Sequence, residues 1–309
     1  MERNLPYRDY NSYLRELFGC RVHKITIDAG MTCPNRDGTK GFGGCIYCNA
    51  RGSGTGQWNL GKSVRQQLEE AKPYLKKRFK AEKFLAYFQS YSNTYAPLER
   101  LKALYEEALS VEDVVGLTIG TRPDCVSSEV LDYLAQLSNN YYVCLEYGLQ
   151  SAHDSTLRLI HRGHDVQTFV ETLKETRNRN IPVCVHVIIG LPGESEEDML
   201  DTARFLAKLD IQSVKIHLLY VVKGTVLEKW YLEGKYQCLS RENYVRIVSR
   251  FIALLPPSIV IQRLTGDPHP EELVAPQWAL NKQQNLQAII NYMRNNGLTQ
   301  GSLLTKNSL

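Results

Sequence analysis

Residues 33–48 read Cys33-Pro-Asn-Arg-Asp-Gly-Thr-Lys-Gly-Phe-Gly-Gly-Cys45-Ile-Tyr-Cys48. Three cysteines are spaced C-x11-C-x2-C among glycines, just after a run rich in β-branched residues. Thiolates bind iron, and a cubane [4Fe–4S] cluster normally takes four of them. A cluster held by three protein thiolates leaves one iron open for a small-molecule ligand. This stretch therefore indicates a catalytic site rather than a structural one.

The same cysteines allow two other kinds of site. Cys45 and Cys48 form a C-x2-C pair, which together with Cys33 and a fourth ligand such as His23 could bind zinc. A C-x2-C pair by itself could be a redox-active dithiol. A zinc ribbon needs a second closely spaced pair, and the remaining cysteines are solitary in the sequence. The iron–sulfur interpretation is therefore favoured.

Composition sets the outer limits. The chain has 309 residues, of which 43% are apolar, and α/β barrels of this length commonly form a single domain. Eight cysteines without an N-terminal apolar signal segment favour a cytoplasmic protein, and no run approaches the roughly 18 apolar residues of a membrane span. The net charge of +4 permits a nucleic-acid partner without requiring one.

Strand and helix patterns alternate six times between residues 22 and 220. Six strand–helix repeats with right-handed crossovers predict a parallel sheet. We divide the chain into an N-terminal extension (1–21), a core (22–220) and a C-terminal extension (221–309). The predicted strands cover 22–28, 83–89, 114–121, 142–149, 183–189, 213–219 and 259–264. The predicted helices cover 64–79, 98–109, 127–137, two pieces within 154–179, 196–209, 241–255 and 279–295.

Strand parity predicts a polar interior. Alternate residues of a strand point to opposite faces of the sheet. If the apolar faces pack against outer helices, the polar faces line a lumen suited to a polar ligand. On the fourth strand, Val143, Leu145, Tyr147 and Leu149 share the apolar face; the polar faces carry Cys144, Glu146, Gly148 and Gln150 on that strand, His186 and Gly190 on the fifth, and Lys215 and His217 on the sixth.

The cysteine stretch resembles the cluster motif of the radical S-adenosylmethionine (SAM) enzymes. Tyr47 matches the aromatic residue that this family usually has before its third cysteine. The whole phrase is similar to that of the YhcC/YtqA-type group, which is related to the catalytic subunit of Elongator, a modifier of wobble uridine in tRNA. The resemblance implies an α/β fold, a (β/α)6 partial TIM barrel, with a [4Fe–4S] cluster on Cys33, Cys45 and Cys48 and SAM on the open iron.

The resemblance also implies which residues bind SAM. Gln89 stands where the family holds the SAM amino group, although the usual Gly-Gly-Glu is absent. Glu146 and Gln150 resemble the fourth-strand motif that contacts the ribose and methionine ends. Arg158 follows where a family arginine often pairs with the SAM carboxylate, and Gly190 belongs to a segment that packs on the adenine.

The implied reaction is reductive cleavage of SAM to a 5′-deoxyadenosyl radical, with a flavodoxin or ferredoxin as electron donor. Lys215 and His217 are candidates for substrate contact or proton transfer. The favoured substrate is tRNA, modified at a wobble uridine; the basic run Lys72–Lys80 fits phosphate contact, although a solvated helix face is the commoner reading. One alternative is a radical SAM enzyme acting on a small molecule such as a porphyrin precursor. The other is a non-catalytic, metal-bearing RNA-binding protein.

Overall fold

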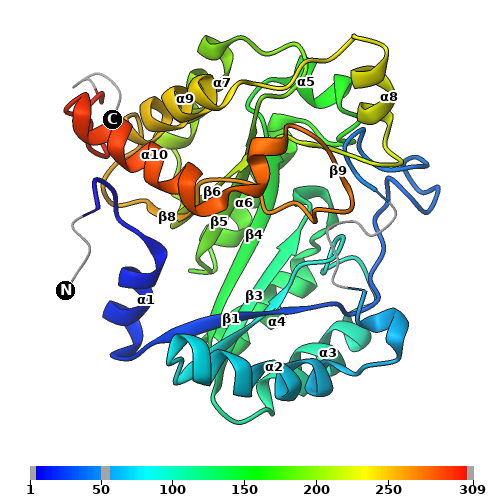
Figure 1. The fold of residues 1–309 in the computed structure, drawn as a ribbon. Coiled ribbons are helices and arrows are strands. Elements are labelled where there is room, and N and C mark those ends of the chain that lie inside the picture. The colour runs from blue at the N-terminus through cyan, green and yellow to red at the C-terminus, as the bar shows by residue number, and fades with distance from the viewer. Residues whose placement is uncertain (1–4, 50–55, 305–309) are drawn as a thin grey trace.

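The computed structural model describes residues 5–49 and 56–304, which are built around a seven-stranded parallel sheet. The sheet curls into a partial barrel, so the expected fold class is confirmed. In Figure 1, β1 crosses the lower part of the molecule and β6 and β8 lie above it. The strand order is β1 (Val22–Ile27), β2 (Lys83–Phe88), β3 (Val114–Thr121), β4 (Tyr142–Gln150), β5 (Val183–Ile189), β6 (Ser213–Leu218) and β8 (Val260–Arg263).

Helices between the strands cover the outer face of the sheet. Several of them begin at a serine or aspartate whose side chain accepts a backbone N–H of the first turn, as Ser63 and Ser195 do. These caps separate each helix from the strand before it. The helices are α2 (Val64–Phe79), α3 (Leu98–Leu109), α4 (Ser128–Ser138), α5 (Asp154–Leu159), α6 (Val166–Arg177), α7 (Glu196–Ala207), α9 (Arg241–Ala253) and α10 (Lys282–Asn295).

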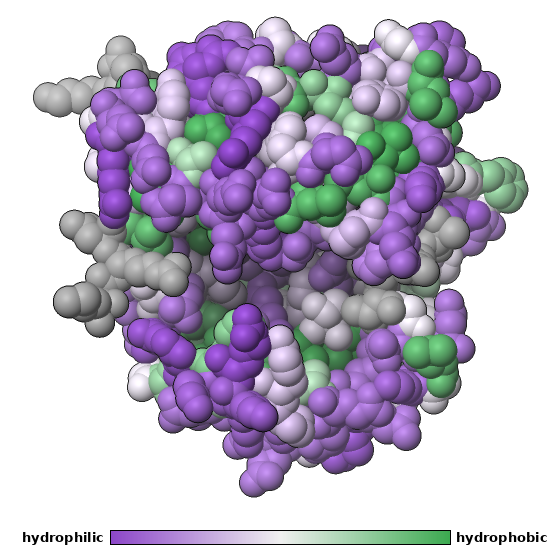
Figure 2. Space-filling model, viewed as in Figure 1, coloured by the Kyte–Doolittle hydropathy of each residue, from purple (hydrophilic) through white to green (hydrophobic). Residues whose placement is uncertain are grey.

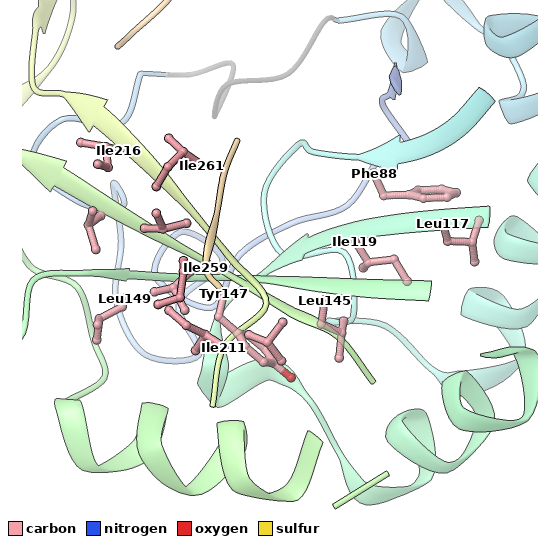
Figure 3. Packing of buried hydrophobic residues seen from close by; sticks show 14 of the residues in the cluster. Phe88, Leu117, Ile119, Leu145, Tyr147, Leu149, Ile211, Ile216, Ile259 and Ile261 are labelled. Atoms are coloured by element: carbon pink, nitrogen blue, oxygen red, sulfur yellow. The ribbon is translucent and has the colours of Figure 1, made fainter. Parts of the chain in front are cut away.

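The two faces of the sheet differ as strand parity predicts. Leu145, Tyr147 and Leu149 are fully buried in the main apolar core, and Figure 3 shows them on the side of the sheet that the helices cover. Burial of such side chains contributes about 1.5–3 kcal/mol each. The alternate residues of β4 face the interior of the barrel, where Glu146 meets lysines from other strands.

The edges of the partial barrel are joined by contacts between distant parts of the chain. β8 pairs in parallel with β6 and adds a seventh strand to the six strand–helix repeats of the core. The N-terminal segment lies beside it, with Ile261 N–H donating to the Arg8 carbonyl at 2.8 Å. Helix α1 (Tyr10–Phe18) packs against both β1 and β8. Lys24 Nζ completes the connection by donating to Gln262 Oε1 at 2.8 Å.

Several short elements were not predicted, among them one helix and two strands. Helix α8 (Val226–Leu232) lies in the predicted C-terminal extension, and β7 (Val221–Val222) pairs antiparallel with β9 (Leu273–Ala275). Each is too short to show periodicity, and the β7–β9 pair joins segments that are far apart in sequence. The glycine-rich run 51–56 lies mostly outside the described residues. In the described ranges, no helix has both the length and the apolar composition needed to cross a bilayer.

Candidate functional site

The cysteine loop follows β1 at the carboxyl-terminal edge of the sheet. Backbone hydrogen bonds fold it back on itself: Cys48 N–H donates to the Cys45 carbonyl and Gly44 N–H to the Asn35 carbonyl, both at 2.9 Å. Gly44 has a φ of +84°, a conformation that glycine adopts without strain. Cys33 lies close enough to influence the charge state of Cys48. The loop therefore brings the three predicted iron ligands into one site.

Two buried guanidinium groups lie beside these thiols. Arg162 Nη1 lies 3.7 Å from Cys45 Sγ, and Arg122 Nη1 lies 3.9 Å from Cys33 Sγ. Asp124 holds Arg122 in place through two hydrogen bonds of 2.8 and 2.9 Å. Positive charge next to sulfur favours the thiolate, which is the form that binds a metal.

Charge and burial set the protonation states around the loop. A hydrogen bond from the Cys48 thiol, together with the guanidinium groups of Arg162 and Arg122, lowers the pKa of Cys45 well below its usual value. Burial and the charge of Cys45 raise the pKa of Tyr47 well above its usual value. The Tyr47 phenol therefore stays neutral, and this partly buried aromatic side chain lies next to the cysteines.

Apart from Glu146, which lies in the middle of β4 below it, the residues predicted to bind SAM gather at the same edge of the sheet with one exception. Gln89 follows β2, and Gln150 ends β4 with a φ of +78°. Such a conformation costs a non-glycine residue about 1–3 kcal/mol and is concentrated at functional sites. Gly190 follows β5, and its carbonyl accepts a hydrogen bond from the Tyr236 hydroxyl at 2.9 Å. The exception is Arg158, which is exposed on α5.

Buried polar atoms of β3 and of the segment after β2 have no hydrogen-bond partner among the described residues. Ser90 Oγ, Asn93 Oδ1 and Thr118 Oγ1 belong to residues with no exposed surface, and they make no hydrogen bond within the described part of the chain. Leaving a buried polar atom without a partner costs about 1–3 kcal/mol. These atoms fit a polar ligand that would supply the missing hydrogen bonds.

The lumen below this edge holds a buried ion cluster centred on Glu146. Its two carboxylate oxygens each lie 2.5 Å from a lysine, Lys24 on one side and Lys215 on the other, and His186 Nε2 lies 2.9 Å away. Both ammonium groups also lie over the ring of Tyr87, 4.9 and 4.1 Å from its centroid. Every one of these residues comes from a different strand, so only the curled sheet brings them together.

Within this cluster the charges are strongly coupled. Burial alone would raise the pKa of Glu146, but Lys215 and Lys24 hold it well below its usual value. Burial lowers the pKa of Lys215 to about 8, against the opposing effect of Glu146. Burial and the charge of Lys215 lower the pKa of His186 to about 4, so this imidazole is neutral at pH 7.

His217, the other lumen candidate, stands above Lys215 on β6. Its ring centroid lies 5.1 Å from that of His186, and its Nε2 is buried without a hydrogen-bond partner in the described ranges. Burial and the charge of Arg263 lower the pKa of His217 well below its usual value.

Figure 2 shows this face of the molecule hollowed across its middle, with hydrophilic residues at the bottom of the hollow.

Two sequence-based interpretations involve residues far from the cysteines. His23, the candidate fourth zinc ligand, lies near the start of β1 with its ring 4.7 Å from that of Phe79, so that zinc site is not formed. The basic run on α2 ends near the start of β1 as well. This is shown by Arg21 Nη1, which donates to the Phe79 carbonyl at 2.7 Å. This is the amino-terminal edge of the sheet, one strand length or about 20 Å from the cysteine loop.

Sequence reasoning missed several residues of the site. Arg162 lies inside the motif His161-Arg-Gly-His164, which resembles Asn-Arg-Gly-His of the Elongator-like branch, but the motif did not show which of its side chains faces the cysteines. Strand parity places Lys24 on the polar face of the first strand, but it does not show that Lys24 contacts Glu146. Arg263 had no such signal, because β8 is only four residues long.

Comparison with known proteins agrees with this geometry. Residues 33–206 match the Radical SAM superfamily, and residues 211–295 match the Radical_SAM C-terminal domain. YtqA of Bacillus subtilis is 42% identical over 300 residues, which cover 97% of this chain and 93% of YtqA. Protein YhcC of Escherichia coli is 37% identical over 292 residues, which cover 94% of this chain and 93% of YhcC. The resemblance to the YhcC/YtqA-type group is thus confirmed.

More distant similarities cover only part of the other protein. A tRNA uridine(34) acetyltransferase of Dehalococcoides mccartyi is 30% identical over 173 residues, which are 55% of this chain but 37% of that protein. The solved structure of an N-terminally truncated Elp3 of Methanocaldococcus infernus superposes with a TM-score of 0.69 at 17% identity. That match covers 90% of this chain and 64% of the other, and it concerns the fold.

Proposed function

The chain belongs to the radical SAM superfamily, whose enzymes bind a [4Fe–4S] cluster and SAM, and we propose that its substrate is tRNA. The support is the similarity to the tRNA uridine(34) acetyltransferase over 55% of this chain. A wobble uridine is the proposed position of modification. We also propose the cytoplasm as the location and a flavodoxin- or ferredoxin-type protein as the electron donor.

The residues at the carboxyl-terminal edge fit the cluster. Cys33, Cys45 and Cys48 supply three thiolates, and the cationic side chains of Arg122 and Arg162 stabilise their negative charge. A [4Fe–4S] cluster held by these three cysteines, with SAM bound to it, would supply one-electron reductive cleavage of SAM and radical abstraction of a substrate hydrogen. Tyr47 excludes water from the iron side of the site.

We propose that Arg162, rather than Arg158, pairs with the SAM carboxylate. Arg162 is buried beside Cys45, whereas Arg158 is exposed on α5. A guanidinium suits bidentate recognition of a carboxylate. Gln89 and the unpartnered Ser90 hydroxyl at the end of β2 would hold the SAM amino group.

The remaining assignments concern the other end of SAM and the lumen. Gln150 would contact the ribose and Gly190 would pack on the adenine, since both lie at strand ends next to the loop. Glu146 would act through the lysines that it holds, because both of its oxygens are already engaged. Lys215 and His217 remain candidates for substrate contact.

The test is anaerobic turnover. The chain is reconstituted with iron and sulfide, reduced with dithionite and given SAM, with and without bulk tRNA, and 5′-deoxyadenosine is quantified by mass spectrometry. We expect Cys45→Ala to abolish formation and to lower iron content, and Cys238→Ala, a cysteine outside the site, to retain both. Stimulation by tRNA supports RNA modification.

Two results would contradict the proposal in different ways. Formation of 5′-deoxyadenosine that tRNA does not stimulate would favour a small-molecule substrate. No formation from a fully loaded cluster in either condition would favour the non-catalytic, metal-bearing RNA-binding protein.

A further inference from the structure

The lumen carries more positive than negative charge. Lys24, Lys215 and Arg263 contribute three cations, and Glu146 is the acidic residue that contacts the cluster. Lys24 and Lys215 are already paired with the Glu146 oxygens. Arg263 has no ion-pair partner among the residues that the structure describes.

Arg263 stands opposite Lys215 in the register of β6 and β8. Its guanidinium is half-buried and makes no hydrogen bond or ion pair with any described residue. Its field reaches Tyr87, His186 and His217, which places it at the lumen rather than on the outer surface. A half-buried guanidinium without a protein partner is available to an oxyanion ligand, because it presents N–H donors in a fixed fork.

A second unpartnered group lies beside it. His217 Nε2 is buried with no hydrogen-bond partner in the described part of the chain, and this imidazole is neutral. A neutral imidazole can donate one N–H to an oxygen acceptor. Arg263 and His217 therefore offer donors to the same part of the lumen.

A metal ion fits this cluster poorly. Ligand atoms of Glu146, Cys184 and His186 lie within 4.8 Å of one another, which is close enough to share an ion. However, Lys24 and Lys215 already occupy both carboxylate oxygens, and their ammonium groups would repel a cation. The same charges attract an anion.

We propose that Arg263, Lys215 and His217 form a binding site for an oxyanion, a phosphate or carboxylate group carried by a small acidic molecule. The site is deep, because Lys215 lies three residues before the end of β6, about 10 Å below the carboxyl-terminal edge. A compact acidic group reaches that depth more readily than an RNA backbone. The inference rests on the proposed function, because the acidic molecule would be a substrate, or a second substrate, of the radical reaction.

The experiment measures anion binding by the reconstituted full chain, without turnover. Inorganic phosphate and malonate are titrated separately at constant ionic strength, with chloride as the balancing anion, and the melting temperature is followed. We expect at least one probe to raise the melting temperature of the wild type beyond chloride. The probe that raises the melting temperature more shows whether the site prefers a phosphate or a carboxylate group.

Variants locate the binding. Arg263→Gln is expected to need at least ten times more probe for the same rise in melting temperature. Arg263→Lys is expected to need less probe than Arg263→Gln, because it keeps the positive charge. Arg78→Gln, which removes the same charge from the exposed end of α2, is expected to leave the response unchanged. Because Arg263 has no partner to lose, Arg263→Gln without probe should melt no lower than the wild type, which separates lost binding from lost folding.

Three outcomes overturn the proposal. The first is that neither probe raises the melting temperature of the wild type. The second is that the probe raises the melting temperature of Arg263→Gln as much as that of the wild type. The third is that saturating tRNA abolishes the effect of phosphate, which would assign the site to RNA. SAM cleavage without added substrate is measured on the same samples. If it persists while anion binding is absent, only the oxyanion site fails; if it is absent while anion binding persists, only the proposed function fails.

Discussion

Arg162 and Cys45 are 117 residues apart in the chain, yet Arg162 Nη1 lies 3.7 Å from Cys45 Sγ. The same guanidinium donates to the Gly148 carbonyl at 2.6 Å, so it connects the cysteine loop to β4. This contact holds the cysteine loop against β4 and leaves a buried cation beside Cys45, where we propose that the SAM carboxylate binds.

Replacing Arg162 with methionine should weaken SAM binding. A hydrogen bond between charged groups contributes about 1.5–3 kcal/mol, so we expect a loss of roughly 10- to 100-fold in affinity. Equilibrium dialysis with the oxidised, reconstituted protein measures it. Arg158→Met is the matched control and should change the affinity less than twofold; the reverse ranking of the two variants would restore Arg158 as the SAM ligand.

Replacing Glu146 with glutamine should destabilise the fold more than it weakens SAM binding. It leaves Lys24 and Lys215 buried without a counter-charge, which costs about 3–5 kcal/mol. The free energy of unfolding in urea is the measurement. Glu175→Gln, which removes one partner of an exposed i,i+4 ion pair with Arg179, should cost less than about 1 kcal/mol. Equal effects of the two substitutions would contradict the buried cluster.

Lys215 should leave a signature in the pH dependence of stability. Burial lowers its pKa to about 8, whereas an unfolded lysine titrates near 10.4. Between these pH values the unfolded chain binds more protons, so this group makes stability rise with pH, by at most about 1.4 kcal/mol per unit. Its unfavourable contribution is complete below pH 8 and vanishes above about pH 10.4.

Subtracting the free energy of unfolding of Lys215→Met from that of the wild type isolates this contribution. We expect the difference to increase from pH 8 to pH 10 in urea titrations. A difference that stays constant over that interval would show that Lys215 keeps an ordinary pKa.

Gln300 should be important for closing the partial barrel. Its Oε1 accepts Arg8 N–H at 2.9 Å, and its Nε2 donates to the carbonyls of Pro256 and Ile259 at 2.7 and 2.6 Å. Gln300→Ala should lower the free energy of unfolding by about 2–3 kcal/mol, because it leaves buried backbone groups without a hydrogen-bond partner. Exposed Gln287→Ala should stay within about 0.5 kcal/mol of the wild type. Limited proteolysis should show earlier cleavage near the N-terminus only in Gln300→Ala.

The basic run on α2 should contribute little to the action on tRNA. Lys77 and Arg78 are exposed at the amino-terminal edge of the sheet, opposite the cysteine loop. The double substitution Lys77→Gln, Arg78→Gln should leave the salt dependence of tRNA binding unchanged. Each phosphate contact adds roughly 0.7–0.9 to the slope of log K against log salt. A slope shallower by about 1–2 in the double variant would place RNA on this helix.

Much of the fold was predictable because it depends on local geometry. Alternation with a period of two identifies strands, and a period of 3.6 identifies helices. The predicted limits of α2, α3, β3 and β5 therefore agree with the structure. The faces of β4 were also predictable, since alternate side chains of any strand lie on opposite sides.

The sequence by itself determined the cysteine triad, the order of strands and helices, and the polar character of the lumen, because each is expressed in neighbouring residues. Only the tertiary structure decided that β8 and α1 close the sheet, that Arg162 rather than Arg158 lies beside Cys45, and that Arg263 stands beside Lys215 with no ion-pair partner among the described residues. These relationships join residues far apart in the chain, and they exist only when the sheet curls and its edges meet.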